Sequence, residues 1–106
     1  MTARKAKTLT KQQIFRVLRE NPALLKQHAV RKIGLFGSYA RGRPKEGSDL
    51  DFLVEFERPT YDNFIGLANG LEKLFGRKVD ILTPEGLDSI RVTGVADSIR
   101  KSLAYG

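Results

Sequence analysis

The chain has 106 residues, a formal net charge of +7 and no cysteine. This length suits one domain with a modest core, and the lack of cysteine excludes disulfides and thiolate metal sites, so we expect a cytoplasmic protein. No apolar run approaches the length of a membrane span. No signal peptide is visible either, because the basic start leads into a polar segment. We expect residues 1–8 to be a disordered basic tail and residues 9–106 to form the domain.

The charge is distributed unevenly along the chain. Residues 1–45 hold 12 Lys and Arg and one acid, whereas residues 46–106 hold 7 basic and 11 acidic residues. A basic half could attract DNA, a phosphorylated substrate or an acidic partner protein. We favour a solvated helix face or tail for the outer basic residues and a functional role for the inner ones. The outer set is Arg4, Lys5, Lys7, Lys11, Arg16 and Arg19, and the inner set is Arg41, Arg43 and Lys45.

The first elements along the chain are two helices and a strand. Thr10 and Gln13 have the spacing of a capping box, and an apolar stripe at helical spacing follows them. Pro22 can start a second, short helix because proline fits the first helical turn. We expect His28, the single histidine, to be a surface residue near the end of that helix. Val30 to Phe36 is predicted to be the first strand.

Gly37 and Ser38 directly follow this strand and open a short helix-compatible turn that reaches Arg41. Glycine lets a backbone approach a ligand closely, and the N–H groups that open a helix favour a phosphate. The serine hydroxyl and the permanent charge of Arg41 suit phosphate oxygens. These three residues therefore predict a phosphate cradle.

An acidic pair begins the second strand. Asp49 and Asp51 are separated by one residue, so in a strand their side chains share one face while the alternate apolar residues share the other. Two carboxylates this close repel each other unless a cation lies between them, and Mg²⁺ with its oxygen ligands is the preferred candidate. A phosphate cradle beside such a pair indicates nucleoside triphosphate chemistry. The apolar set is Leu50, Phe52, Val54 and Phe56.

A long amphipathic helix follows the acidic strand. We expect Asp62 or Asn63 to cap its start and Gly76 to end it. Gly66 and Gly70 lie inside this helix, where each costs about 1 kcal/mol relative to alanine. They are four residues apart and so mark one side of the helix, where the close approach of another backbone would explain them.

The third strand carries another acid. In the strand from Lys78 to Leu82, Asp80 points away from Val79 and Ile81, onto the face expected for the first acidic pair. The alternative is an exposed acid on an edge strand. A final helix from Val92 to Leu103 is predicted to pack back on the sheet. These elements predict a small α/β domain, with a three-stranded mixed sheet, helices packed on one face and the acid-bearing face open.

The Gly37-Ser38 step, the spacer from Tyr39 to Ser48 and the Asp49-Leu50-Asp51 triplet together resemble a known signature. It is that of the minimal nucleotidyltransferase domains of the DNA polymerase β superfamily, and the resemblance extends from about Leu9 to Tyr105. It implies a nucleotidyltransferase with ATP as co-substrate and two Mg²⁺ ions. The implied catalytic and metal-binding residues are Asp49, Asp51 and Asp80, and the implied nucleotide-binding residues are Gly37, Ser38 and Arg41.

At this size the chain is similar to the antitoxin half of prokaryotic HEPN/MNT toxin–antitoxin pairs. That resemblance implies transfer of AMP from ATP to a hydroxyl, that of a tyrosine, on a partner HEPN ribonuclease toxin, which neutralises the toxin. Because the chain ends directly after the core, we expect the acceptor to lie on a partner with its own binding surface. We therefore expect a hetero-oligomer with the toxin and no membrane association.

Other functions are compatible with the same residues. One is a non-catalytic steric antitoxin or a nucleotide-binding subunit of a hetero-oligomer, although the chain contains all three acids and the Gly-Ser step. Another is a subunit of a small-molecule nucleotidyltransferase. Nucleic-acid binding is not favoured, because the chain lacks the stacking aromatics and zinc ligands of common nucleic-acid readers.

Overall fold

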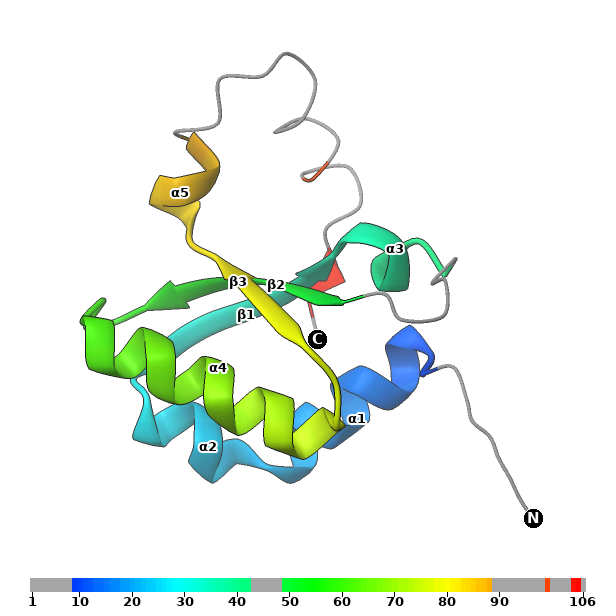
Figure 1. Cartoon of the computed structure of the whole chain (residues 1–106), viewed down its shortest axis with the longest axis horizontal. Coiled ribbons are helices and arrows are strands. Elements are labelled where there is room, and N and C mark those ends of the chain that lie inside the picture. Colours follow the sequence, from blue (N-terminus) through cyan, green and yellow to red (C-terminus); the bar gives the residue numbers. More distant parts are fainter. Residues whose placement is uncertain (1–8, 43–48, 89–98, 100–103, 106) are drawn as a thin grey trace.

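The protein folds as an α/β domain in which a mixed sheet lies against helices (Figure 1). The computed structural model describes residues 9–42, 49–88, 99 and 104–105. Within these ranges, no helix is both long enough and apolar enough to cross a membrane. The elements in chain order are α1 (Lys11–Glu20), α2 (Pro22–Gln27), β1 (Val30–Phe36), α3 (Gly37–Ala40), β2 (Leu50–Phe56), α4 (Tyr61–Phe75), β3 (Val79–Leu82), α5 (Pro84–Asp88) and β4 (Ala104–Tyr105).

The sheet has the strand order β3-β2-β1-β4 and combines both kinds of strand pairing. β1 runs antiparallel to β2, while β2 runs parallel to β3, as the long crossover through α4 predicts. The predicted three-stranded mixed sheet is therefore confirmed, and a fourth strand of two residues, β4, extends it beside Gly34 and Leu35 of β1. A strand this short has no period-2 pattern, so sequence periodicity could not predict it.

Two predicted segments fall mainly outside the described residues. The basic tail, residues 1–8, is one of them. The other is the final helix from Val92 to Leu103, of which Ile99 is described and is helical.

Helices α1, α2 and α4 lie on one side of the sheet, and the core lies between them and the strands (Figure 1). The alternate apolar residues of β2 face this core as predicted. Their exposed fractions are 0% for Leu50, Phe52 and Val54 and 9% for Phe56. Burial of these four side chains fixes which face of β2 the intervening acids occupy.

The opposite face of the sheet is not open along its whole length. Leu53 lies on that face, yet it is only 5% exposed. Helix α5 contacts β2 and lies on the other side of the strands from α4 (Figure 1). Its Leu87 is also 5% exposed, so this helix covers part of the face expected to be open. The prediction that helices pack on one face therefore holds for α1, α2 and α4 and is corrected for α5.

Threonine hydroxyls cap the starts of α1 and α4. Before α1, the Thr10 hydroxyl accepts from the Gln13 N–H and the Gln13 side chain accepts from the Thr10 N–H, so the predicted capping box is confirmed. The prediction that Asp62 or Asn63 caps α4 is wrong. Thr60 has an extended backbone there, and its hydroxyl accepts from the Asn63 N–H at 3.1 Å. Threonine at this position satisfies an amide that the first turn cannot.

The two glycines inside α4 mark the side on which α2 packs, but they make room for side chains and not, as predicted, for another backbone. A Cβ on Gly66 would lie 2.4 Å from Cε1 of His28, and a Cβ on Gly70 would lie 2.6 Å from Cδ1 of Leu24. His28 does lie at the end of α2, but it is half-buried rather than a plain surface residue. Its ring fills the space that a side chain at position 66 would need.

Candidate active site

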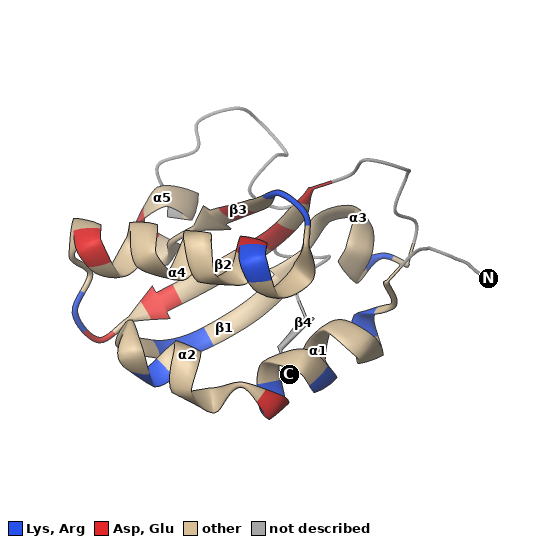
Figure 2. Ribbon diagram, turned by 60° about the horizontal axis from the view of Figure 1, so that its bottom comes forward, with Lys and Arg blue, Asp and Glu red and all other residues tan. Residues whose placement is uncertain are grey.

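Three carboxylates lie together where β2 and β3 begin. Asp51 and Asp80 are register partners in the parallel pair, so their side chains lie on the same face of the sheet. The Leu50 N–H donates to the carbonyl of Lys78 at 3.0 Å, which ties the two strand starts together. Asp49 directly precedes β2, and its side chain lies within hydrogen-bonding range of Asp80. Figure 2 shows acidic residues gathered where these strands lie side by side.

Burial and mutual repulsion raise the proton affinity of two of these acids. Loss of hydration, and then the charges of Asp80 and Asp49, raise the pKa of Asp51 from 3.8 to about 6. The charge of Arg41 acts against this shift. Loss of hydration, and then the charge and hydrogen bonding of Asp49, also raise the pKa of Asp80. The cluster therefore has more negative charge than its surroundings balance, which favours a bound cation.

The donor chemistry of this cluster fits Mg²⁺, which binds hard oxygen ligands. Among the described residues, no group of three or more His, Cys, Asp or Glu side chains could hold a metal ion, so the protein alone does not form a metal cage. Mg²⁺ does not need such a cage, because it is usually held by one or two carboxylates together with water and substrate phosphates. One or two of these acids could therefore serve as Mg²⁺ ligands beside the phosphates of a bound triphosphate.

Gly37 brings the chain that follows β1 directly against the acids. Its φ is +76°, which only glycine adopts readily, and a Cβ at this position would lie 2.3 Å from Oδ2 of Asp51. Phe36, the last residue of β1, is the register partner of Asp51. Ser38 follows in the single turn of α3 and is half-buried. Position 37 therefore requires glycine for two reasons. Its backbone has a positive φ, and the Asp51 carboxylate occupies the place of a Cβ.

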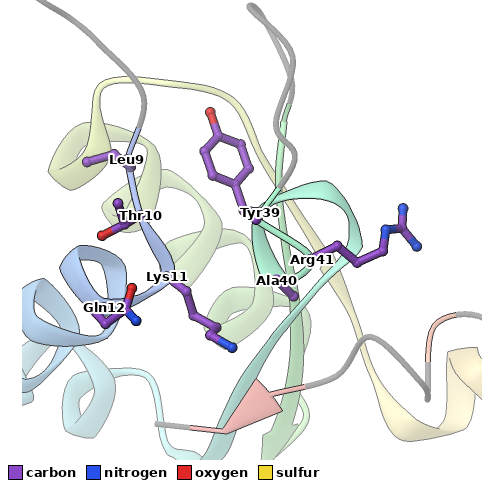
Figure 3. Close-up of a pocket in the computed structure, with 8 residues that line it drawn as sticks. Leu9, Thr10, Lys11, Gln12, Tyr39, Ala40 and Arg41 are labelled. Carbon is purple, nitrogen blue, oxygen red and sulfur yellow. The ribbon is translucent and has the colours of Figure 1, made fainter.

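Arg41 caps the C-terminal end of α3 and is exposed. Its charge lowers the pKa of Asp51, so the structure brings it within electrostatic range of the acids. Its side chain points away from Lys11 and Gln12 (Figure 3). The other two members of the inner basic set, Arg43 and Lys45, lie outside the described residues.

A pocket of about 300 Å³ lies between the start of α1 and α3 (Figure 3). Lys11, assigned from the sequence to a solvated helix face, lines this pocket and is half-exposed. The full lining is Leu9, Thr10, Lys11, Gln12, Tyr39, Ala40, Arg41 and Gly42. Sequence reasoning also missed a contact between Tyr39 and Arg77, for which no local pattern exists.

Comparison with known proteins gives the class of protein that this fold and site define. The family model of the nucleotidyltransferase domain matches residues 14–105, which is most of the chain. The chain therefore belongs to the nucleotidyltransferase domain family and is a nucleotidyltransferase. Within that family it belongs with the protein adenylyltransferases. It is 39% identical to the protein adenylyltransferase MntA of Thermococcus cleftensis over 99 residues, which cover 92% of this chain and 96% of the relative.

Two solved structures show the same fold. A candidate minimal nucleotidyltransferase matches with a TM-score of 0.70 and 27% identity, over 93% of this chain and 98% of that one. A toxin–antitoxin complex with AMP-PNP contains a chain that matches with a TM-score of 0.59 and 25% identity. That match covers 92% of this chain and 72% of the other. The fold expected from the Gly-Ser and Asp-Leu-Asp motifs is thus confirmed.

Proposed function

We propose that this protein transfers AMP from ATP to a tyrosine hydroxyl of a HEPN ribonuclease toxin and thereby neutralises the toxin. The observation that carries the proposal is the convergence of Asp49, Asp51 and Asp80 beside the backbone of Gly37. The activity named for the Thermococcus relative supports AMP transfer to a protein. The toxin–antitoxin complex with AMP-PNP supports an adenine nucleotide as donor and a toxin as partner.

The donor nucleotide would contact residues at both ends of α3. The N–H groups at Gly37 and Ser38, together with the serine hydroxyl, would contact the β- and γ-phosphates. Arg41 would offset the charge that develops on the departing pyrophosphate. Asp49 and Asp51 would hold Mg²⁺, which supplies charge neutralisation on the triphosphate and a lowered pKa of the acceptor hydroxyl.

Asp80 would act on the acceptor side. It is exposed, whereas Asp51 beside it is half-buried, so Asp80 is the acid that an incoming hydroxyl can reach. The hydroxyl oxygen forms a bond to the α-phosphorus while the bond from this phosphorus to the bridging oxygen breaks, and pyrophosphate leaves. The raised pKa of Asp80 makes its carboxylate a better acceptor for the hydroxyl proton than an ordinary surface acid.

The test is label transfer to the purified toxin partner in the presence of Mg²⁺. We expect label from ATP labelled at the α-phosphorus to appear on the toxin, and label at the γ-phosphorus to stay off it. This pair of substrates separates AMP transfer from phosphorylation. Replacing the modified tyrosine of the toxin by phenylalanine should abolish the signal.

A purely steric antitoxin would give a different result. It would neutralise the ribonuclease without transferring label, and a double Asp49→Asn, Asp51→Asn variant would neutralise it equally well. That outcome would refute catalysis while leaving the toxin as partner. Transfer of label to a small molecule and not to the toxin would refute the protein acceptor.

A further inference from the structure

A single arginine joins α3 to the start of β3. Arg77 donates a hydrogen bond from Nη1 to the hydroxyl of Tyr39, although 38 positions separate the two residues. Its guanidinium carbon also lies 5.7 Å from the centroid of the Tyr39 ring, within range of a cation–π interaction. The same arginine therefore contacts both the polar tip and the face of this tyrosine.

Tyr39 is the anchor of α3. This helix is a single turn of four residues, and Tyr39 is its one buried residue, with 3% of its surface exposed. Gly37 and Ser38, the proposed phosphate-binding residues, immediately precede it. Because so short a helix has few hydrogen bonds of its own, its position depends on how the tyrosine is held.

Arg77 belongs to the connection that leads from α4 into β3. It lies between Gly76, which ends α4, and β3, where Asp80 is the second residue. A contact from Arg77 to Tyr39 consequently connects the strand that carries Asp80 to the turn that carries Ser38.

Arginine is not the residue that packing alone would favour here. Its Nε is buried and has no hydrogen-bond partner among the described residues, and a buried N–H without a partner is unfavourable. An apolar side chain of similar length would fill the space without this cost. The contact with the Tyr39 hydroxyl is the interaction that only a long donor side chain at position 77 provides.

We infer that Arg77 is a positioning residue, which holds α3 through the Tyr39 hydroxyl so that the phosphate-binding turn faces the acids of β2 and β3. This inference rests on the proposed nucleotidyl transfer. It assigns Arg77 no contact with ATP. It therefore predicts that losing the contact weakens ATP binding through movement of α3, while the acids on the strands keep their places.

The test compares Tyr39→Phe, Arg77→Met and the double variant with the wild-type protein. Tyr39→Phe removes only the hydroxyl and keeps the ring in the core. Calorimetry with Mg²⁺ and ATP should show the dissociation constant rising about fivefold in each single variant, as for the loss of one hydrogen bond. The double variant should be no weaker than either single one, because both changes break the same contact.

Steady-state transfer to the toxin provides the second readout. KM for ATP should rise by a similar factor, kcat should change by less than about twofold, and Arg77→Lys should recover part of the affinity. Arg16→Met is the matched control, since it removes one exposed arginine from α1. Its ATP affinity should equal that of the wild-type protein.

Several outcomes would overturn the inference. A folded Tyr39→Phe protein with wild-type ATP affinity would do so, as would additive effects in the double variant or an equal loss in Arg16→Met. If Arg77→Met fails to fold, Tyr39→Phe alone decides. A wild-type protein that neither binds ATP nor transfers label would refute the proposed function, and this inference with it.

Discussion

Asp51 on β2 and Asp80 on β3 are direct partners across a parallel strand pair, although the whole of α4 separates them in the chain. The pairing holds two carboxylates on one face, with Asp49 beside them. Loss of hydration, and then the charges of Asp80 and Asp49, raise the pKa of Asp51 to about 6. A cation or a proton must compensate this charge. The dependence of stability and ATP binding on pH and Mg²⁺ follows from the competition between the proton and the cation.

Without metal, we expect the protein to become more stable as the pH falls from about 7.5 to about 5. The pKa of Asp51 is about 6 in the fold and 3.8 ordinarily, so between these values the folded protein binds a proton that the unfolded chain has released. This contribution is present in full below 3.8 and is lost as the pH rises through 6. Thermal melting in a chelator measures it, and Asp51→Asn should flatten the dependence.

Mg²⁺ should raise the melting temperature more at about pH 7.5 than at about pH 5, because protons compete with the metal for the carboxylates. The same ion should strengthen ATP binding, as measured by calorimetry with and without chelator. Equal stabilisation at both pH values, or an ATP affinity indifferent to Mg²⁺, would show that the acids hold no metal.

Gly37→Ala should destabilise the protein by about 1–2 kcal/mol, because alanine would have to adopt a left-handed backbone conformation. It should also reduce the rate of transfer about a hundredfold. The added methyl group would lie 2.3 Å from Oδ2 of Asp51 and must displace it. Gly76→Ala is the matched control. Gly76 ends α4 with a φ of +67°, as predicted, and an added Cβ there meets nothing within 4 Å.

The control should therefore lose similar stability and keep its transfer rate. Denaturant unfolding and label transfer on both variants separate the two effects. If Gly37→Ala retained full activity, the close approach of its backbone to the acids would have no catalytic importance.

Gly66→Ala should lower the melting temperature although alanine is the better helix former by about 1 kcal/mol. The methyl group would lie 2.4 Å from Cε1 of the His28 ring, which would have to leave its place against α4. In Gly70→Ala the added methyl group would meet the flexible end of Leu24, so the melting temperature should fall less. Asn69→Ala, on the exposed side of the same helix, should stabilise slightly. A stabilised Gly66→Ala variant would show that α2 is free to move away.

Local patterns were enough to predict the strands that carry the acids. The bounds of β1 were predicted as Val30 to Phe36 and are the same in the structure, because the strand ends where Gly37 adopts a φ of +76°. The alternation in β2 placed Asp51 opposite the core, and a parallel crossover brings Asp80 to the same face. These features depend on neighbours in sequence or on a rule of chain connection.

Features that depend on distant contacts could not be predicted in this way. The hydrogen bond from Arg77 to Tyr39 joins two residues that look unremarkable in their own segments. The cap of α4 was misplaced because Thr60, Asp62 and Asn63 are all good capping residues, and the backbone conformation decides among them. The pairing of β4 with β1 likewise depends on where the chain returns, which a two-residue segment does not indicate.

We expect Asp80 to work together with Asp49 and Asp51 in nucleotidyl transfer. Asp80→Asn is nearly isosteric, so the variant should fold normally. Its affinity for ATP should stay within about twofold of the wild-type value. An amide can neither bind the metal as strongly nor accept the hydroxyl proton, so transfer should fall about a hundredfold or more. Glu57→Gln, at an exposed position after β2, removes the same charge as a control.

The most direct measurement is the rate at which α-labelled ATP modifies the toxin, determined beside melting curves and ATP titrations of the same preparations. We expect a folded Asp80→Asn protein that binds ATP and transfers almost no label, next to a fully active Glu57→Gln protein. Wild-type transfer by a correctly folded Asp80→Asn protein would contradict this expectation and leave Asp80 as an ordinary surface acid.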